Sequence, residues 1–180
     1  MTRRYDPERR DRIIDAAIDC IAEDGVAGTS HRKVAARAGV PLGSMTYHFE
    51  NMDDLLVEAF TRFAASIGDA FERRLAAARD RDAAVEAIVA LIHGDLQRSR
   101  REHVLTYELY TLAARRAAFR SITHRWMRES RRALERHFAP DTARALDAYV
   151  EGAALHIALH PDPQPPALTR AAVARLASGG

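Results

Sequence analysis

Basic residues gather in one stretch near the beginning of the chain. Residues 26–49 contain no aspartate or glutamate and three basic residues, Arg32, Lys33 and Arg37. The whole 180-residue chain has 27 Lys and Arg against 25 Asp and Glu, so its net charge of +2 says little about its partners. A local cluster of cations, by contrast, suits the phosphates of a nucleic acid. We expect the acidic residues of the preceding helix to lie on its opposite side; they are Asp15, Asp19, Glu23 and Asp24.

Two short helices joined by a tight turn are predicted to carry these cations. A first helix is expected over residues 7–25, bracketed by a proline and a glycine. Ser30 is a good N-cap for a second helix, and Gly39 suits the left-handed conformation that ends it. A proline then opens a third helix over residues 41–48. Two short helices around a glycine turn are typical of the helix-turn-helix motif.

The rest of the chain also has the periodicity of helices. A long helix begins after Asn51, whose side chain suits a cap, and keeps one face apolar as far as Phe71. Further helices are predicted at residues 83–99, 102–114, 116–138, 142–160 and 166–178, and no stretch alternates like a strand. The predicted fold class is therefore all-α. A three-helix helix-turn-helix domain at residues 1–50 precedes a helical domain at residues 51–180.

Composition and motifs exclude several classes of protein. No apolar run approaches the ~18 residues that a membrane-spanning helix needs, and the charged start lacks the apolar stretch of a signal peptide. We therefore expect a cytoplasmic protein with no membrane partner. No phosphate loop, nucleophile motif or zinc motif points to an enzyme. His156 and His160 have the i, i+4 spacing of metal ligands, but two ligands on one helix are weak evidence, so we expect no metal and no cofactor.

The segment GTSHRKVAARAGVPLGSMTYHFENMDDLL, residues 28–56, resembles the DNA-binding domain of the TetR family of bacterial repressors. The match is most specific at Ala35, Ala38, Gly39, Val40, Tyr47, His48, Phe49, Leu55 and Leu56. The resemblance covers roughly the first 65 residues, and the helical remainder fits the family in length. It implies a transcriptional regulator that binds double-stranded operator DNA as a homodimer. In that family the last two helices of each subunit form the dimer interface.

The resemblance also assigns roles on the DNA surface. The third helix of the family enters the major groove, so base edges are expected to face Leu42, Gly43, Ser44 and Thr46. Arg32 is the guanidinium best placed for a guanine. The residues that this family uses for the DNA backbone correspond to Ser30, Lys33, Tyr47 and His48, whereas Phe49 is expected in the core.

Two departures from the family pattern affect these roles. Thr46 stands where the family often has a first aromatic residue before the histidine. Met52 replaces the usual lysine near the start of the fourth helix, which removes one phosphate contact. We expect Arg3, Arg4 or Arg9 of the N-terminal arm to compensate by reaching the backbone or the minor groove.

The C-terminal part mixes aromatic and polar residues on the same helices, which is typical of a pocket for a small-molecule effector. The residues predicted to line it are His93, Tyr107, Glu108, Tyr110, Phe119 and Trp126. An ordinary core with its Tyr and Trp polar atoms satisfied at the edge is the alternative for each of them. Glu108 favours an effector that is largely apolar and either neutral or cationic. We expect this effector to release the protein from its operator.

The last two predicted helices are rich in small and apolar residues. Without a partner they would expose an apolar patch, so they favour a homodimer. A second function stays open from the sequence: a DNA-bound architectural or cell-division adaptor whose C-terminal surface binds a protein. A preformed internal cavity favours the regulator, and a filled core with an exposed groove favours the adaptor.

Overall fold

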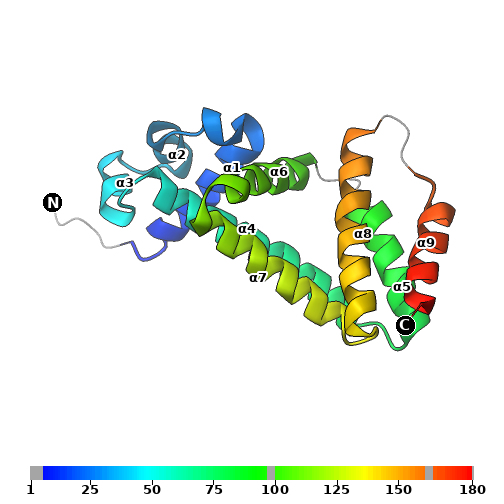
Figure 1. Ribbon diagram of the computed structural model, residues 1–180. Helices are drawn as coiled ribbons and strands as arrows, with labels where there is room; N and C mark the ends of the chain where they lie inside the picture. The colour runs from blue at the N-terminus through cyan, green and yellow to red at the C-terminus, as the bar shows by residue number, and fades with distance from the viewer. Residues whose placement is uncertain (1–5, 97–99, 161–163, 180) are drawn as a thin grey trace. The chain divides into compact units, whose positions relative to one another are not determined.

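The computed structural model describes residues 6–96, 100–160 and 164–179, which are helical apart from short links (Figure 1). The helices are α1 (Arg9–Gly28), α2 (His31–Ala38), α3 (Gly43–His48), α4 (Met52–Ala76), α5 (Arg81–Ala90), the π-helical turn η1 (Leu91–Leu96), α6 (Arg100–Arg115), α7 (Ala117–Leu134), α8 (Pro140–Leu159) and α9 (Pro166–Ser178). The described ranges contain no strand, which confirms the all-α fold. None of their helices is both long and apolar enough to cross a membrane.

Contacts between residues divide the chain into two compact units. Unit 1 comprises Met1–Phe63 and Val104–Ile122, and unit 2 comprises Ala64–His103 and Thr123–Gly180. Three helices, α4, α6 and α7, contribute to both units. The predicted domain boundary at residue 50 does not coincide with the division between these units. The assignment of DNA binding to residues 1–50 and of ligand binding and dimerisation to residues 51–180 stays a prediction.

Unit 1 is organised around the apolar stripe predicted for α1. That stripe is buried and includes Ile13, Ile14, Ala17, Ile18 and Ile21. α2 packs on α1, and α3 packs on α2. Phe60 of α4 and Phe119 of α7 complete the core with edge-to-face rings whose centroids are 6.1 Å apart.

The local signals for the helix-turn-helix hold in detail. The Ser30 hydroxyl oxygen accepts a hydrogen bond from the Lys33 backbone N–H at 3.3 Å, as an N-cap does. Gly39 ends α2 in the left-handed conformation, with φ 63° and ψ 36°. The first helix differs from its prediction, because it continues for one turn beyond Gly25, which has φ 70° and forms a kink. The Thr29 hydroxyl secures this last turn by donating to the Gly25 carbonyl at 2.8 Å.

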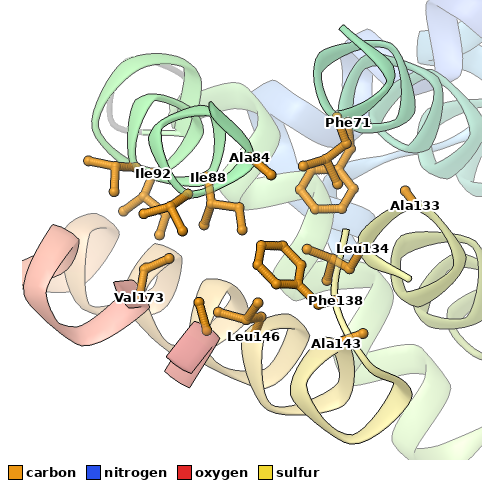
Figure 2. Packing of buried hydrophobic residues seen from close by; sticks show 14 residues of the cluster. Phe71, Ala84, Ile88, Ile92, Ala133, Leu134, Phe138, Ala143, Leu146 and Val173 are labelled. Carbon is orange, nitrogen blue, oxygen red and sulfur yellow. The ribbon is translucent and has the colours of Figure 1, made fainter. Parts of the chain in front are cut away.

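Unit 2 has its own apolar core between α5, α8 and α9 and the ends of α4 and α7 (Figure 2). Its largest members include Phe71, Ile88, Ile92, Leu134, Phe138, Leu146 and Val173. Figure 2 shows the Phe71 and Phe138 rings among the aliphatic side chains of the neighbouring helices. A hydrogen bond from a side chain to the backbone also joins two parts of the unit, since Nε2 of His137 lies 2.8 Å from the Leu75 carbonyl oxygen.

Two helix boundaries differ from their predictions. The predicted helix at residues 83–99 begins earlier because the Asp80 carboxylate caps α5, accepting from the Ala83 backbone N–H at 2.8 Å. It then changes to the π-helical η1, and residues 97–99 lie outside the described ranges. The predicted helix at 116–138 ends at Leu134, whose carbonyl accepts from the N–H groups of His137 and Phe138 in the turn that follows.

Candidate nucleic-acid interface and effector residues

A surface groove lies where the N-terminal end of α2 meets α3. Its volume is about 530 Å³, and it is lined by Ser30, His31, Arg32, Leu42 and Thr46. Ser30, Arg32, Leu42 and Thr46 were predicted from the sequence to contact DNA, and the fold brings these four together. His31, the first residue of α2, lines the groove with them, and the resemblance to the TetR family places it among the residues that meet phosphates.

The cations of α2 differ in how they are held. The Lys33 ammonium lies 3.1 Å from the Asp24 carboxylate. Arg37 makes a two-pronged ion pair with Glu23, one hydrogen bond of which is 2.7 Å long. Arg32 is exposed and has no ion pair with any residue that the structure describes. Among the predicted DNA contacts, Arg32 is therefore the cation with its full charge available.

These ion pairs correct the expectation that the acids of α1 lie away from the cations. Asp24 and Glu23 face α2, and Asp19 lies 3.9 Å from the Arg37 guanidinium. Only Asp15 of that group is directed elsewhere, since it pairs with Arg62 of α4 at 2.8 Å. The packing of α2 across α1 places its cations beside these carboxylates, which a charge count along the sequence does not reveal.

α3 exposes apolar groups and no charged carboxylate, ammonium or guanidinium group. Leu42, just before α3, is 51% exposed, and Tyr47 is 77% exposed. A Cβ atom added at Gly43 would meet no atom within 4 Å, so packing does not require the glycine. An exposed side-chain-free position of this kind suits close approach to a nucleic acid.

Ser44 does not fit the predicted contact with base edges. Its side chain is 1% exposed, and its hydroxyl oxygen has no hydrogen-bond partner among the described residues. Ser44 lies on the inward side of α3 together with the buried Met45. Ser44 is therefore a residue of the interior and not of the DNA surface.

Thr46 and His48 lie on the outside of α3 with different constraints. The Thr46 hydroxyl donates to the Gly43 carbonyl at 3.3 Å. His48 is half-buried beside Tyr47, with ring centroids 4.8 Å apart. Burial lowers the pKa of His48, and the nearby positive charges of Arg9 and Arg10 lower it further. His48 is thus a neutral hydrogen-bonding group at neutral pH.

The residues that flank α3 hold it in place. Phe49 is buried, as expected, and the Arg10 guanidinium lies 5.3 Å from its ring centroid. The Asn51 side chain caps α4 by accepting from the Asp54 backbone N–H at 3.0 Å. Of the N-terminal arm, Arg9 lies 3.8 Å from Asp6, whereas Arg3 and Arg4 fall outside the described residues.

Three of the predicted effector residues lie together on α6 in unit 1. Tyr107, Glu108 and Tyr110 are all half-buried. Glu108 has no hydrogen bond or ion pair with any residue that the structure describes. Its carboxylate lies against the kink of α1: a Cβ atom added at Gly25 would lie 2.5 Å from Oε1 of Glu108, so the carboxylate would have to move.

The other predicted effector residues have separate surroundings. Phe119 is 1% exposed in the core of unit 1, and its contact with Phe60 accounts for its burial without a ligand. In unit 2, Nε2 of His93 is hydrogen-bonded to the Thr169 hydroxyl at 2.7 Å. Trp126 is half-buried on α7, also in unit 2. Among the described residues, no three His, Cys, Asp or Glu side chains are grouped to hold a metal ion.

Comparisons with known proteins agree with this architecture. The family described as "Bacterial regulatory proteins, tetR family" matches residues 13–59, and "Tetracyclin repressor-like, C-terminal domain" matches residues 79–179. The transcriptional regulator BetI 1 of Chromohalobacter salexigens is 30% identical over 166 residues, which are 86% of this chain and 81% of the relative.

Solved structures extend the agreement to three dimensions. A protein of Streptomyces coelicolor A3(2) described as a transcriptional regulator is 55% identical, with a TM-score of 0.90 over 96% of this chain and 99% of that one. The multidrug binding protein EbrR in complex with ethidium is 39% identical, with a TM-score of 0.81 over 94% of this chain and 99% of that one. EbrR has also been solved with proflavin and with malachite green. The chain therefore belongs to the TetR family and is a ligand-responsive, DNA-binding transcriptional regulator.

Proposed function

We infer that the protein is a cytoplasmic repressor, which binds a pseudo-palindromic operator as a homodimer and is released by a small aromatic cation. It acts by binding rather than by catalysis. The groove between α2 and α3 supports the contact with DNA, because it combines the unpaired cation Arg32 with exposed groups of α3. Ser30, Lys33, Tyr47 and His48 serve the phosphate backbone, and Arg32 and Thr46 face base edges.

The carboxylate of Glu108 is the observation that carries the choice of effector. It is half-buried, has no cation partner among the described residues, and lies on the same helix as Tyr107 and Tyr110. A carboxylate without a cation partner, on a helix that also carries two tyrosines, suits a cationic aromatic molecule, which can gain both ion pairing and ring contacts. Ethidium, proflavin and malachite green, three of the molecules solved with EbrR, are aromatic cations, and a fourth is imidazole. Ligand contacts from His93, Phe119 and Trp126 stay predictions.

The position of Glu108 also gives a route from effector to DNA. Its carboxylate lies against Gly25, and Gly25 is followed in α1 by the last turn and preceded by Asp24, which holds Lys33. A cation that draws the Glu108 carboxylate away removes this contact beside the kink. The resulting movement would reach α2 through the packing of α1 on α2 and the pair of Asp24 with Lys33. Release requires that the effector bind the DNA-incompetent state more tightly, and a coupling of about 1–3 kcal/mol reduces operator affinity about 5- to 150-fold.

The exposed apolar residues of unit 2 support the homodimer. Leu159 of α8 is 71% exposed and Leu168 of α9 is 58% exposed, with Leu155 of α8 at 41%. α8 and α9 pack on each other, so both helices are available to one partner surface. A twofold dimer also places two recognition helices about 34–36 Å apart, in successive major grooves.

Ethidium provides the test of the effector. It should raise the thermal unfolding temperature and weaken binding to an operator selected from random duplexes. Glu108→Gln should lower ethidium affinity, whereas Glu135→Gln, at the exposed glutamate that follows α7, should not. Because coupling is reciprocal, operator DNA must weaken ethidium binding by the same factor. Stabilisation by ethidium with unchanged operator affinity would separate ligand binding from regulation.

Sedimentation provides the test of the dimer. The wild-type chain should sediment as a dimer at micromolar concentration, and Leu159→Glu with Leu168→Glu should give a monomer that keeps its helical circular dichroism. The monomer should bind a single half-site and lose the preference for the palindrome. A wild-type monomer that binds half-sites and palindromes alike would contradict the dimeric mode.

A further inference from the structure

The base-reading side of α3 offers few polar groups for hydrogen bonds to bases. Gly43 has no side chain, and the Ser44 hydroxyl is buried. No Asn, Gln or Arg lies in α3, so the bidentate contacts that usually identify adenine or guanine are absent from that helix. Leu42 and Thr46 are the members of the groove that α3 and its N-cap supply.

Thr46 offers DNA a hydroxyl and a methyl group. Its hydroxyl donates to the Gly43 carbonyl at 3.3 Å. While that bond is made, the hydroxyl oxygen can still accept a hydrogen bond from a base, but it does not donate one to O6 or N7 of guanine or to O4 of thymine. Its other substituent at Cβ is the methyl group, and Thr46 is exposed in the groove.

Leu42 adds a second apolar group at the same place. Half of its surface is exposed, although solvent exposure of a leucine gains nothing for a free protein. In the major groove, the one apolar group that a base presents is the 5-methyl group of thymine. Cytosine has hydrogen at that position and so presents no methyl group for an apolar side chain to contact.

We propose that the groove between α2 and α3 reads thymine 5-methyl groups through Leu42 and the Thr46 methyl group. The inference rests on the proposed binding of operator DNA and adds the base chemistry that the operator must contain. Arg32, at the rim of the same groove, contacts a neighbouring guanine. Each half-site accordingly contains at least one thymine at a position where its methyl group contributes to affinity.

Deoxyuridine gives a direct test, because it lacks only the 5-methyl group and keeps the pairing of thymidine. Operators are first selected from random duplexes with the wild-type protein. The selected duplex is then synthesised with deoxyuridine in place of each thymidine in turn, and affinity is measured by fluorescence anisotropy. At the thymines read by the groove, affinity should fall about fourfold for each methyl group, as expected for burial of one methyl.

Variants of Thr46 assign the effect to the groove. Thr46→Ser removes the methyl group and keeps the hydroxyl, so it should reduce the ratio of thymidine to deoxyuridine affinity toward one. Thr46→Val keeps a methyl group without the hydroxyl and should retain the ratio, whatever its overall affinity. Leu42→Ala should reduce the ratio at the same or the adjacent thymine. Thr111→Ser, the same change at an exposed threonine of α6, is the control and should leave the ratio as in the wild type.

The outcomes separate this inference from the function on which it rests. Equal affinity for the thymidine operator and a fully deoxyuridine-substituted one would overturn the reading of methyl groups while leaving operator binding intact. If Thr46→Ser and Leu42→Ala both kept the wild-type ratio of thymidine to deoxyuridine affinity, the assignment of methyl reading to this groove would be overturned. Failure to select any duplex would overturn the proposed function and the inference with it.

Discussion

The two short helices of the DNA-binding surface differ in their chemistry. α2 has a cap at each end and three cations, two of which are paired with acids of α1. α3 and its N-cap have no Lys, Arg, Asp or Glu and expose Leu42 and Tyr47. Phosphate contacts position a protein on DNA, whereas base contacts specify the sequence. The cations for phosphates therefore lie on α2, and most groups proposed to contact bases lie on α3 and its N-cap. Arg32 of α2 is the exception, because it is a cation proposed to contact a base.

The ion pairs of α2 bear on charge rather than on stability. The Lys33 and Asp24 side chains are 52% and 45% exposed, and exposed pairs of this kind contribute little to the free energy of unfolding. Their effect on DNA affinity should be larger than their effect on stability, because a carboxylate beside Lys33 offsets the attraction of its ammonium for phosphate. Substitutions at these pairs should therefore change DNA affinity more than they change folding stability.

Arg32→Ala should have the largest effect. Because Arg32 is the α2 cation without an ion pair among the described residues, its loss should weaken operator binding about 5- to 150-fold and relax preference at one base pair. Competition between single-base operator variants measures that preference. Arg125→Ala, at an exposed arginine of α7, is the matched control. An equal loss on operator and random DNA would show instead that Arg32 contacts a phosphate.

Gly43→Ala should separate DNA binding from folding. A Cβ atom at Gly43 has open space around it, and alanine favours a helix, so stability should be unchanged or higher by up to about 1 kcal/mol. The added methyl group should nevertheless keep α3 from its closest approach to DNA and reduce operator affinity about tenfold, the effect of a ~1.4 kcal/mol misfit. Urea unfolding and anisotropy titrations measure the two quantities. If Gly43→Ala bound the operator with wild-type affinity, α3 would not approach the base edges closely at this residue.

Asp24→Asn and Lys33→Ala should change DNA affinity in opposite directions. Removing the Asp24 charge frees the Lys33 ammonium 3.1 Å away, which should strengthen binding to operator and random DNA alike. Lys33→Ala should weaken both and lower the salt dependence by about one unit. Titrations at several salt concentrations measure these slopes. If Asp24→Asn has no effect at low salt, Lys33 does not contact phosphate.

Local signals in the sequence were sufficient for the helices and caps. Ser30 and Gly39 act within a few residues, so their roles follow from residue type and position. The stripe of α1 spans enough turns for its apolar period to define the buried face. α3 has six residues, less than two full turns, and its sequence does not fix which side faces inward. The burial of Ser44 therefore required the packed structure.

Long-range contacts account for the rest of what the sequence missed. The pair between Arg37 and Glu23 and the contact of Glu108 with Gly25 join residues of different helices. His93 was predicted beside an effector from its residue type, but its hydrogen bond to Thr169 depends on how η1 meets α9. The type of a residue determines which interactions it can make, and the packing of the helices determines which partner it makes them with.

Ser44→Ala should have the smallest effect on DNA and a measurable one on stability. The Ser44 hydroxyl is buried without a partner among the described residues, and burying such a group costs about 1–3 kcal/mol. Alanine removes the hydroxyl, and it also favours the helix. We expect the free energy of unfolding to rise by about 1 kcal/mol, with an unchanged denaturant slope.

Urea unfolding at a fixed protomer concentration measures this change, since the stability of a dimer depends on concentration. Ser121→Ala is the control, because Ser121 is exposed on α7 and its change should stay within about 0.5 kcal/mol. Base preference should follow Thr46 and not Ser44, because the Thr46 side chain lines the groove and that of Ser44 lies inside. A fall in stability would mean that the Ser44 hydroxyl has a partner, such as a bound water. A changed base preference would return Ser44 to the DNA surface and remove the contrast between an apolar α3 and a charged α2.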